Sequence, residues 1–330
     1  MKIAALAGGV GGAKLAHGLA QLLPPEDLTI IVNTGDDFEH WGLKISPDLD
    51  TVCYTLAGLA NPLTGWGRID ETWQVFENIE KLAGQTWFRL GDRDLGTHLL
   101  RTERRQRGDK LSTITQDFCH AWGIAHQVLP MTDDPVYTMV STEEQGELAF
   151  QEYFVHQRCE PSVTGFRFDG VRNALPAQGV LDAIHQADAV VFCPSNPWVS
   201  IDPILAVAGI KSACEAKPVF AVSPIIGGDV VKGPAAKMYR ELGIQPSAYA
   251  VAKHYETLLT GFIFDNVDIA LEPSIQTMNI ATLVTNTIMK DELDRLRLAK
   301  DVIDFVNSQA KKLSKKHKNK GEITPPLHAN

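Results

Sequence analysis

The sequence predicts an α/β fold built on a doubly wound, mainly parallel sheet with an inserted, mostly helical lobe. Four short segments, at 2–7, 28–34, 187–193 and 217–223, are almost wholly apolar, which is typical of strands buried on both faces of a parallel sheet. A loop and a helix-like segment follow the first, third and fourth of them, so strands and helices alternate. Helical spacing dominates the long stretch between the two pairs of strands, and this predicts the inserted lobe.

The first helix is predicted over 13–23, where the leucines at 15, 19, 22 and 23 share one face and two prolines follow. With the strands on either side it forms a β-α-β unit, which crosses over right-handed. Helical spacing covers roughly 71–122, and alternation over 136–154 predicts a hairpin with Glu-Gln-Gly at its turn. An amphipathic helix is predicted over 288–312. We therefore expect one domain over 1–310, with an insertion at about 60–175 and a basic, disordered tail at 311–330.

Composition and charge exclude several classes of protein. The chain has 330 residues, of which 44% are hydrophobic and 22% charged, as in an ordinary globular enzyme. Its net charge of −9 argues against a nucleic-acid partner. Five scattered cysteines suit a reducing compartment, and neither a signal peptide nor an apolar run of about 20 residues is apparent. We expect a cytoplasmic protein with no membrane partner.

The glycine-rich turn GGVGGAKL directly follows the first strand. A dinucleotide fingerprint needs a third glycine where Lys14 stands, and an acid where the second strand ends in Asn33. A Walker loop needs Ser or Thr after the lysine, and Leu15 follows it instead. Exposed N–H groups and a helix N-terminus still favour an anion by about 0.3–2 kcal/mol. The alternative is a tight turn in which glycine serves only packing.

Acidic residues gather after the second strand. Asp36, Asp37, Asp48 and Asp50 all lie in the segment 33–52, at the carboxyl end of a strand where open α/β sheets bind ligands. Carboxylates beside a phosphate become useful when Mg²⁺ lies between them. Helix capping by Asp48 and solvated acids elsewhere remain the alternative.

Other loops could bind phosphate, ribose or base. Ser195 and Asn196 directly follow the strand at 187–193, and the segment 223–228 follows the next strand in the same way. GPAAK (233–237) could begin a helix and bind an anion. The acids and arginines of FRLGDRDLGTH (88–98) could act in a site or only cap a helix and form local ion pairs, and LPMTDDP (129–135) could be only a turn.

Eight segments in a fixed order carry a resemblance to a known family. GGVGGAKL, VNTGDD, ISPDLDTV, LGDRDLGTH, LPMTDDP, PSNP, AVSPIIGG and GPAAK run over about residues 1–260. In them the chain resembles the 2-phospho-L-lactate transferase family of coenzyme F-420 biosynthesis. WGRIDETW (66–73) is more similar to the bacterial phosphoenolpyruvate transferase branch than to the archaeal one.

The resemblance implies a Rossmann-like core with a helical lobe, commonly in a homodimer. It implies transfer of a 2-phospholactyl or phosphoenolpyruvyl group from a guanosine diphosphate-linked donor to the hydroxyl of the deazaflavin Fo, with Mg²⁺ as cofactor and GMP released. By this resemblance Asp50 and Arg89 bind the deazaflavin, Gly9, Gly11, Gly12 and Lys14 bind the nucleotide phosphates, and Ser195 and Asn196 bind the guanosine. From the chemistry of the residues we add Asn33 to the nucleotide site, Asp36, Asp37 and Asp50 as metal ligands, and Asp50 and Asp48 as catalytic residues, and which acid binds metal and which accepts the proton stays open.

Two other classes remain to be weighed against this enzyme. One is a non-catalytic regulator of the same superfamily that binds a nucleotide sugar, in which a Gly/Ser-rich loop would replace ISPDLDT. The other is an NAD-dependent dehydrogenase, which Lys14 and Asn33 disfavour. Binding of GDP or GMP with Mg²⁺, of a UDP-sugar or of NAD separates the three.

Overall fold

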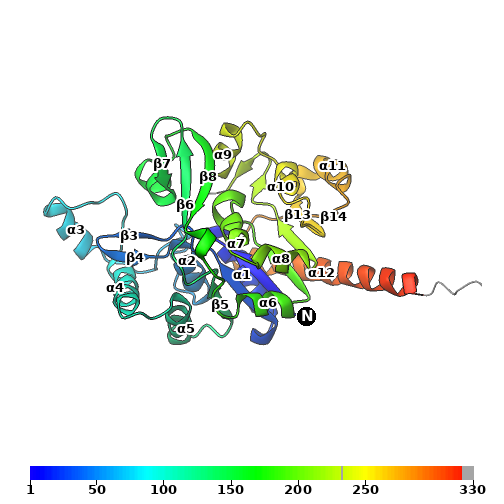
Figure 1. Cartoon of the computed structure of the whole chain (residues 1–330), viewed down its shortest axis with the longest axis horizontal. Helices are drawn as coiled ribbons and strands as arrows, with labels where there is room; N and C mark the ends of the chain where they lie inside the picture. Colours follow the sequence, from blue (N-terminus) through cyan, green and yellow to red (C-terminus); the bar gives the residue numbers. More distant parts are fainter. Residues whose placement is uncertain (232, 322–330) are drawn as a thin grey trace, which may run out of the picture.

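A seven-stranded parallel sheet forms the centre of the protein (Figure 1). The computed structural model describes residues 1–231 and 233–321, and for 313–321 the backbone only. The order in the sheet is β14-β13-β10-β9-β1-β2-β5, and each neighbouring pair is parallel. The strands are β1 (Ile3–Ala7), β2 (Leu28–Val32), β5 (Gln127–Pro130), β9 (Ala189–Phe192), β10 (Val219–Val222), β13 (Gly261–Asp265) and β14 (Ala281–Thr285).

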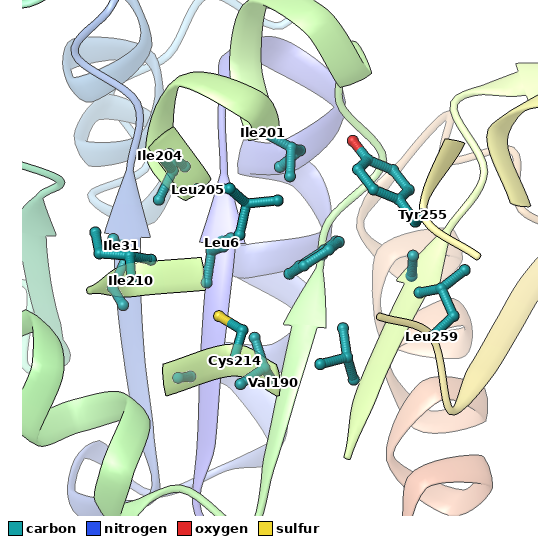
Figure 2. Packing of buried hydrophobic residues seen from close by; sticks show 14 of the residues in the cluster. Leu6, Ile31, Val190, Ile201, Ile204, Leu205, Ile210, Cys214, Tyr255 and Leu259 are labelled. Atoms are coloured by element: carbon teal, nitrogen blue, oxygen red, sulfur yellow. The ribbon is translucent and has the colours of Figure 1, made fainter. Parts of the chain in front are cut away.

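Helices cover both faces of this sheet, because its strands are apolar on both. Ala4 and Leu6 of β1 contribute to one core with α6 (Val180–Gln186), α7 (Asp202–Ala206), α8 (Ile210–Glu215) and α10 (Ala248–His254), part of which Figure 2 shows. Ile3, Ala5 and Ala7 contribute to the opposite core with α1 (Gly9–Leu22), α2 (Pro47–Leu56), α5 (Leu111–Ala121) and α12 (Glu292–Gly321). Burial of strands on both faces explains their unbroken apolar sequences.

The sheet reverses its winding between β1 and β9. From β1 the chain passes to β2 and then β5 on one side, and the later strands β9, β10, β13 and β14 follow on the other. Open α/β sheets bind ligands at the carboxyl ends of strands at such a reversal. The loops after β1 and β9 are therefore expected to border the site.

Smaller elements surround this edge of the sheet. β3 (Phe38–His40) and β4 (Leu43–Ile45) form a hairpin, and β7 (Gly146–Ala149), β6 (Tyr137–Thr142) and β8 (Val163–Asp169) form an antiparallel sheet. Two helices, α3 (Gln74–Lys81) and α4 (Asp92–Gln106), lie in the segment before β5. The remaining elements are η1 (Pro25–Asp27), η2 (Glu152–His156), η3 (Val171–Asn173), η4 (Pro197–Ile201), β11 (Ile225–Ile226), β12 (Asp229–Val230), α9 (Ala235–Glu241), η5 (Asn266–Leu271) and α11 (Glu272–Gln276).

The predicted fold class is confirmed, and several boundaries differ from those predicted. β5 joins the edge of the central sheet, so it divides the predicted insertion at 60–175 into two parts. The first helix begins at Gly9, because the glycine turn is already its first turn. The hairpin near 136–154 is present, but its second strand ends at Ala149 and a π-helix follows.

The terminal helix α12 continues to Gly321, beyond the predicted end at 312, and its end extends past the body of the molecule (Figure 1). The first part of the predicted disordered tail is therefore helical, and residues 322–330 lie outside the described residues. Within the described chain, every helix is too short or too polar to span a bilayer.

Candidate active site

A cavity of about 850 Å³ opens where β1, β9, β10 and β14 end. Residues that directly follow these strands form one part of its wall: Gly8 to Gly11, Pro194 to Asn196, Ser223 and Pro224, and Thr287 to Met289. α2, α4 and the segments 66–67, 87–89 and 150–159 form the other part. The cavity thus lies at the position that the reversal of the sheet predicts.

The glycine turn and the loop after β9 are packed against each other. Ser195 Oγ accepts a hydrogen bond from the backbone N–H of Gly8 (3.2 Å) and donates one to its carbonyl oxygen (3.1 Å). A Cβ at Gly11 would lie 2.3 Å from the carbonyl oxygen of Pro194, and one at Gly12 would lie 2.7 Å from Ser195 Oγ. Packing therefore requires glycine at both positions. Gly11 also lines the cavity, whereas Gly12 lies behind the wall.

Lys14 lines the cavity one turn further along α1. Its Nζ donates a hydrogen bond to the carbonyl oxygen of Met289, 2.7 Å away. Met289 follows β14 and belongs to the same wall. The lysine therefore joins the glycine turn to the segment before α12 and places a positive charge near the start of α1.

A carboxylate lies against the glycine turn. Asp48 Oδ2 accepts a hydrogen bond from Asn33 Nδ2 (2.9 Å), and the backbone N–H of Gly9 also donates to this carboxylate. Burial raises the pKa of Asp48 to about 6, although these two hydrogen bonds oppose the shift. Asn33 also bonds the carbonyl oxygen of Val199 and the N–H of Gly35. Asn33 is fully buried and orients Asp48 beneath the turn, so this predicted nucleotide ligand does not line the cavity.

Two further acids accompany Asp48. Asp36 lines the main cavity and also a neighbouring one of about 340 Å³, which Asp37 lines as well. Burial, with the nearby charges of Asp48 and Asp37, raises the pKa of Asp36 well above its usual value. Burial raises the pKa of Asp37 to about 8, although its hydrogen bond from Ser46 Oγ (2.7 Å) opposes the shift. Within the described residues, Oδ1 of Asp36 and Oδ1 of Asp37 have no hydrogen-bond partner.

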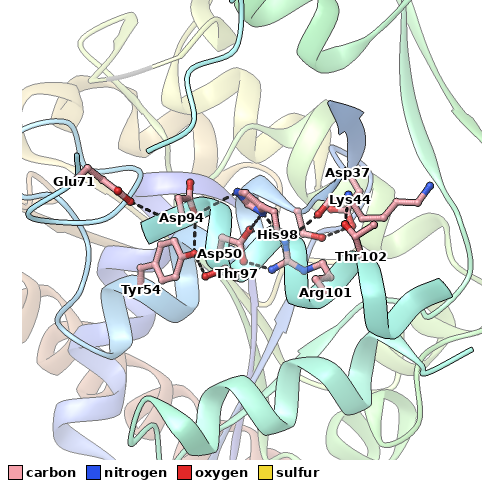
Figure 3. A network of polar contacts seen from close by, with 11 residues as sticks. Asp37, Lys44, Asp50, Tyr54, Glu71, Asp94, Thr97, His98, Arg101 and Thr102 are labelled. Carbon is pink, nitrogen blue, oxygen red and sulfur yellow. Dashed lines mark hydrogen bonds and ion pairs between the residues drawn. The ribbon is translucent and has the colours of Figure 1, made fainter. Parts of the chain in front are cut away.

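Asp50 differs from these acids because a buried cation holds it (Figure 3). Arg101 Nη1 donates to Asp50 Oδ2 at 2.9 Å, and Arg101 Nη2 donates to Asp50 Oδ1. Only 2% of Arg101 is exposed. Burial alone would lower the pKa of Arg101, but the charge and hydrogen bonds of Asp50 outweigh it and raise the pKa. This two-point pair fixes the orientation of the Asp50 carboxylate.

Three residues of α4 face Asp50 at a spacing of four and three residues. Asp94, His98 and Arg101 lie on one side of the helix, as this spacing requires. His98 Nε2 is 3.3 Å from Asp94 Oδ1, and His98 Nδ1 is 3.7 Å from Asp50 Oδ2. Tyr54 Oη donates to Asp94 Oδ1 at 2.6 Å. Burial alone would raise the pKa of Asp94, but the nearby His98 and the hydrogen bond from Tyr54 outweigh it and lower the pKa below its usual value.

The two acids of the motif LGDRD have different roles. Asp92 accepts from the backbone N–H groups of Gln74 and Val75, both at 3.0 Å, and so caps α3. Glu71 in turn accepts from the N–H groups of Arg93 (2.7 Å) and Asp94 (2.8 Å) and caps α4. Capping therefore explains Asp92, whereas the Asp94 side chain lines the cavity.

The wall beyond Asp50 and Asp94 is aromatic. Its rings come from Tyr54, Trp66, Trp87, Phe88, Phe150 and Phe154. Arg89 lines the same region, and its guanidinium carbon lies 4.5 Å from the centre of the Trp73 ring, in cation–π contact. Such a surface suits the flat face of an aromatic ligand.

Two groups of side chains could hold a divalent cation. Ligand atoms of Asp50, Asp94 and His98 lie within 4.8 Å of one another. However, Arg101 already donates hydrogen bonds to both oxygens of Asp50 and neutralises its charge. Asp36 and Asp48 fit a cation better, because both are buried in the cavity wall and no ion pair neutralises them in the described part of the chain. Burial raises the pKa values of both carboxyl groups, and a bound cation would oppose that shift.

Comparison with known proteins identifies the family. The model of the family described as 2-phospho-L-lactate transferase CofD matches residues 3–309. The chain belongs to this family. A phosphoenolpyruvate transferase of Streptomyces griseus is 44% identical over 312 residues, covering 92% of this chain and 98% of that one. A 2-phospho-L-lactate transferase of Methanopyrus kandleri is 38% identical over 317 residues, covering 93% and 98%.

The family and the names of these relatives show that the chain is a phospho-group transferase, which confirms the prediction from the sequence. A solved structure of a UPF0052 family protein from Bacillus halodurans superposes with a TM-score of 0.61 at 14% identity, covering 92% of this chain and 98% of that one. At that identity the likeness shows the shared fold alone.

Most of the predicted site residues of this family member line one cavity. They are Gly9, Gly11, Lys14, Asp36, Asp48, Asp50, Arg89, Ser195 and Asn196. Gly12 and Asn33 lie behind its wall, and Asp37 lines the smaller cavity. The sequence reasoning missed Tyr54, Trp87, His98 and Arg101. The spacing of Asp94, His98 and Arg101 in a helical segment was the signal that could have found two of them.

Proposed function

We propose that this protein transfers a phospho-three-carbon-acid group from a guanosine diphosphate-linked donor to the side-chain hydroxyl of the deazaflavin Fo. GMP is released, and the product is a precursor of coenzyme F-420. One observation carries the proposal: a single cavity joins a glycine-rich helix start, suited to a phosphate, to an aromatic wall suited to a tricyclic ring. Acids line the space between the two ends.

The nucleotide end is the start of α1 with the loops after β9 and β14. Its N–H groups and the positive end of α1 favour a phosphate, and Lys14 adds a charge. Ser195 is held in place by Gly8, so it can orient a ligand that lies across both loops. A guanosine diphosphate-linked donor would place its phosphates at the turn and its nucleoside toward Asn196.

The acceptor end is the aromatic wall with Asp50 and Arg89. A deazaflavin ring stacks favourably on aromatic side chains, and the edge of such a ring can meet a cation such as Arg89. Asp50 accepts hydrogen bonds from Arg101 with both oxygens and keeps lone pairs for a hydroxyl that enters the cavity. The acceptor hydroxyl would then point toward the phosphates.

Asp36 and Asp48 would hold the Mg²⁺ ion that we propose as cofactor, with Asp37 behind them. The ion would neutralise phosphate oxygens and allow the two acids to lie beside an anion. This set differs from the expected one because Asp50 is paired with Arg101. Titration of the protein with Mn²⁺, followed by electron paramagnetic resonance, tests the set without any turnover: Asp36→Asn should weaken binding, and Asp92→Asn should not.

The chain itself positions the two reactants for an in-line displacement. The hydroxyl oxygen attacks phosphorus, the bond from phosphorus to the GMP oxygen breaks, and GMP leaves with the electron pair. The hydroxyl proton passes to Asp50, the carboxylate of the wall that would accept a hydrogen bond from this hydroxyl, while Asp48 would stay with the cation. Alignment supplies most of the rate, because a single general base contributes about 10²–10⁴-fold.

The donor acid is proposed to be phosphoenolpyruvate rather than 2-phospholactate. The phosphoenolpyruvate transferases of Streptomyces griseus and Thermobifida fusca are 44% and 46% identical to this chain, against 38% for the 2-phospho-L-lactate transferase of Methanopyrus kandleri. We also propose a cytoplasmic homodimer, which sedimentation of the purified protein would test.

A parallel assay tests the reaction. The protein is incubated with Fo, Mg²⁺ and either guanosine diphosphate-linked donor, and GMP and the product mass are followed. We expect GMP and product in equal amounts, and more from the phosphoenolpyruvyl donor. Asp50→Asn should lower turnover by orders of magnitude, whereas Asp92→Asn, the same change in a helix cap, should not. No GMP above background with intact substrates would refute the proposed function.

A further inference from the structure

Asp50 is surrounded by side chains that the reaction chemistry leaves unexplained. Arg101 and His98 are both almost fully buried, at 2% and 1% exposed, and both face Asp50 from α4 (Figure 3). Burying a guanidinium costs several kcal/mol unless it is paired and bonded. Apolar side chains at these positions would pack α4 against α2 without that cost. The presence of Arg101 and His98 there therefore needs another explanation.

We propose that Arg101 and His98 are positioning residues, which hold the Asp50 carboxylate in one orientation for the acceptor hydroxyl. This inference rests on the proposed function and deepens its acceptor site. Arg101 does not line the cavity, so it acts through Asp50. The acceptor then meets a carboxylate whose direction is set before binding, and little entropy is lost in orienting it.

Arg101 is itself fixed from a third element. Its Nη1 lies 3.4 Å from the carbonyl oxygen of Lys44 in β4, and Thr102 Oγ1 accepts from the Lys44 N–H at 2.7 Å. The guanidinium is therefore held between β4 and α2. A planar guanidinium that is fixed in this way can donate to both oxygens of Asp50 at once. A lysine at this position would offer one nitrogen on a flexible stem and would lose the planar two-point geometry.

His98 lies between two carboxylates of the wall. Its Nδ1 is 3.2 Å from Arg101 Nη1 and 3.7 Å from Asp50 Oδ2, and its Nε2 is 3.3 Å from Asp94 Oδ1. Tyr54 Oη holds the same oxygen of Asp94. The imidazole thus sets the spacing of Asp50 and Asp94, both of which line the cavity. Loss of the ring would remove the hydrogen bond that Arg101 Nη1 donates to Nδ1 and the contact of Nε2 with Asp94, so both carboxylates would be held less firmly.

Matched substitutions separate positioning from folding. Arg101→Lys keeps the charge and loses the fork, and its control is Arg104→Lys, one turn away on α4 and paired with Asp109 and Asp117. His98→Asn places an amide oxygen near the position of Nδ1, where it can accept the hydrogen bond that Arg101 Nη1 donates to the imidazole, whereas His98→Ala loses it. For each variant the KM values for acceptor and nucleotide donor are measured separately, with thermal unfolding as the check on folding.

We expect Arg101→Lys and His98→Ala to raise the acceptor KM, or lower kcat, about tenfold or more with the donor KM unchanged. His98→Asn should recover most of the loss, and Arg104→Lys should match the unmodified protein. A merely structural role would instead lower the melting temperature and change both KM values together. Unchanged acceptor kinetics in a folded Arg101→Lys variant, or equal losses in His98→Asn and His98→Ala, would overturn the inference.

Measuring the equilibrium binding of Fo tests the positioning role separately from the proposed reaction. Trp66 and Trp87 line the cavity, so their fluorescence reports Fo binding without turnover. If the unmodified protein binds Fo but releases no GMP, the reaction is wrong, and the affinities of the same variants still decide the positioning role. If it does not bind Fo, both are wrong.

Discussion

Replacement of Gly11 by alanine should damage both stability and nucleotide binding. The new Cβ would lie 2.3 Å from the carbonyl oxygen of Pro194, a distance that real Cβ atoms essentially never show. Both atoms are anchored, because Gly11 is in the first turn of α1 and Pro194 lies two residues after the end of β9, which pairs with β1. No side-chain rotation relieves the contact, so the two loops must separate by about 0.7 Å.

Overpacking of this kind costs about 1–3 kcal/mol. For domains of 150–250 residues each kcal/mol lowers the melting temperature by about 2–4 °C, so we expect a fall of several degrees. The separation also moves Ser195 away from Gly8, which spoils the alignment of the two loops at the anion. Affinity for GDP, measured by calorimetry with Mg²⁺ present, should fall about tenfold, which corresponds to 1.4 kcal/mol.

Gly96 offers the same substitution without the contact. It lies in α4, is exposed, and an added Cβ would meet nothing within 4 Å. Gly96→Ala should therefore raise stability by about 0.5–1 kcal/mol, through the lower backbone entropy of alanine, and leave GDP affinity unchanged. If Gly11→Ala melts and binds GDP like the unmodified protein, the packing argument for the turn is wrong.

Three further outcomes follow from buried groups and caps. The folded chain retains protons on Asp37 (pKa about 8) and Asp48 (about 6) that the unfolded chain releases near pH 4, so the metal-free protein should lose unfolding free energy from about pH 4 to 8. Thermal unfolding checks this, and Mg²⁺ should restore stability most at pH 8; a flat profile would contradict it. Asp92→Ala should increase hydrogen exchange at the start of α3 but leave the middle of α4 protected. Thiol reagents followed by mass spectrometry should label Cys159 before Cys193 and Cys214, because Cys159 is half-buried at the cavity and the other two are buried. Burial raises the pKa of Cys159 to about 11 and those of Cys193 and Cys214 to about 12.

The sequence predicted what depends on local pattern. Unbroken apolar segments predicted four strands of the central sheet, and glycines with acids at strand ends predicted the side of the sheet that holds the cavity. β5 was missed because four residues of strand beside LPMTDDP give little periodicity. Its place in the sheet comes from pairing with β2, which is a long-range contact.

The partners of the site acids could not be predicted in the same way. Asp50 and Arg101 are 51 residues apart, and no local rule joins a carboxylate on one helix to a guanidinium on another. Asn33 looked like a ligand at a strand end, but its side chain turns inward to Asp48. Burial decides both cases, and burial depends on the packing of α2, α4 and β4 rather than on any one segment.

The part of the cavity wall formed by Thr287, Ile288 and Met289 affects how the protein can fold during translation. Lys14 reaches this segment from the first helix, and Arg297 holds the carbonyl oxygen of Ile288 at 3.0 Å. During translation the glycine turn leaves the ribosome early, while its closing wall leaves last among the residues of the cavity. Because the nucleotide site that we propose includes this wall, a nascent chain would gain stability from bound nucleotide only after α12 has folded onto α1, and its earlier folding would depend on the sheet and its cores.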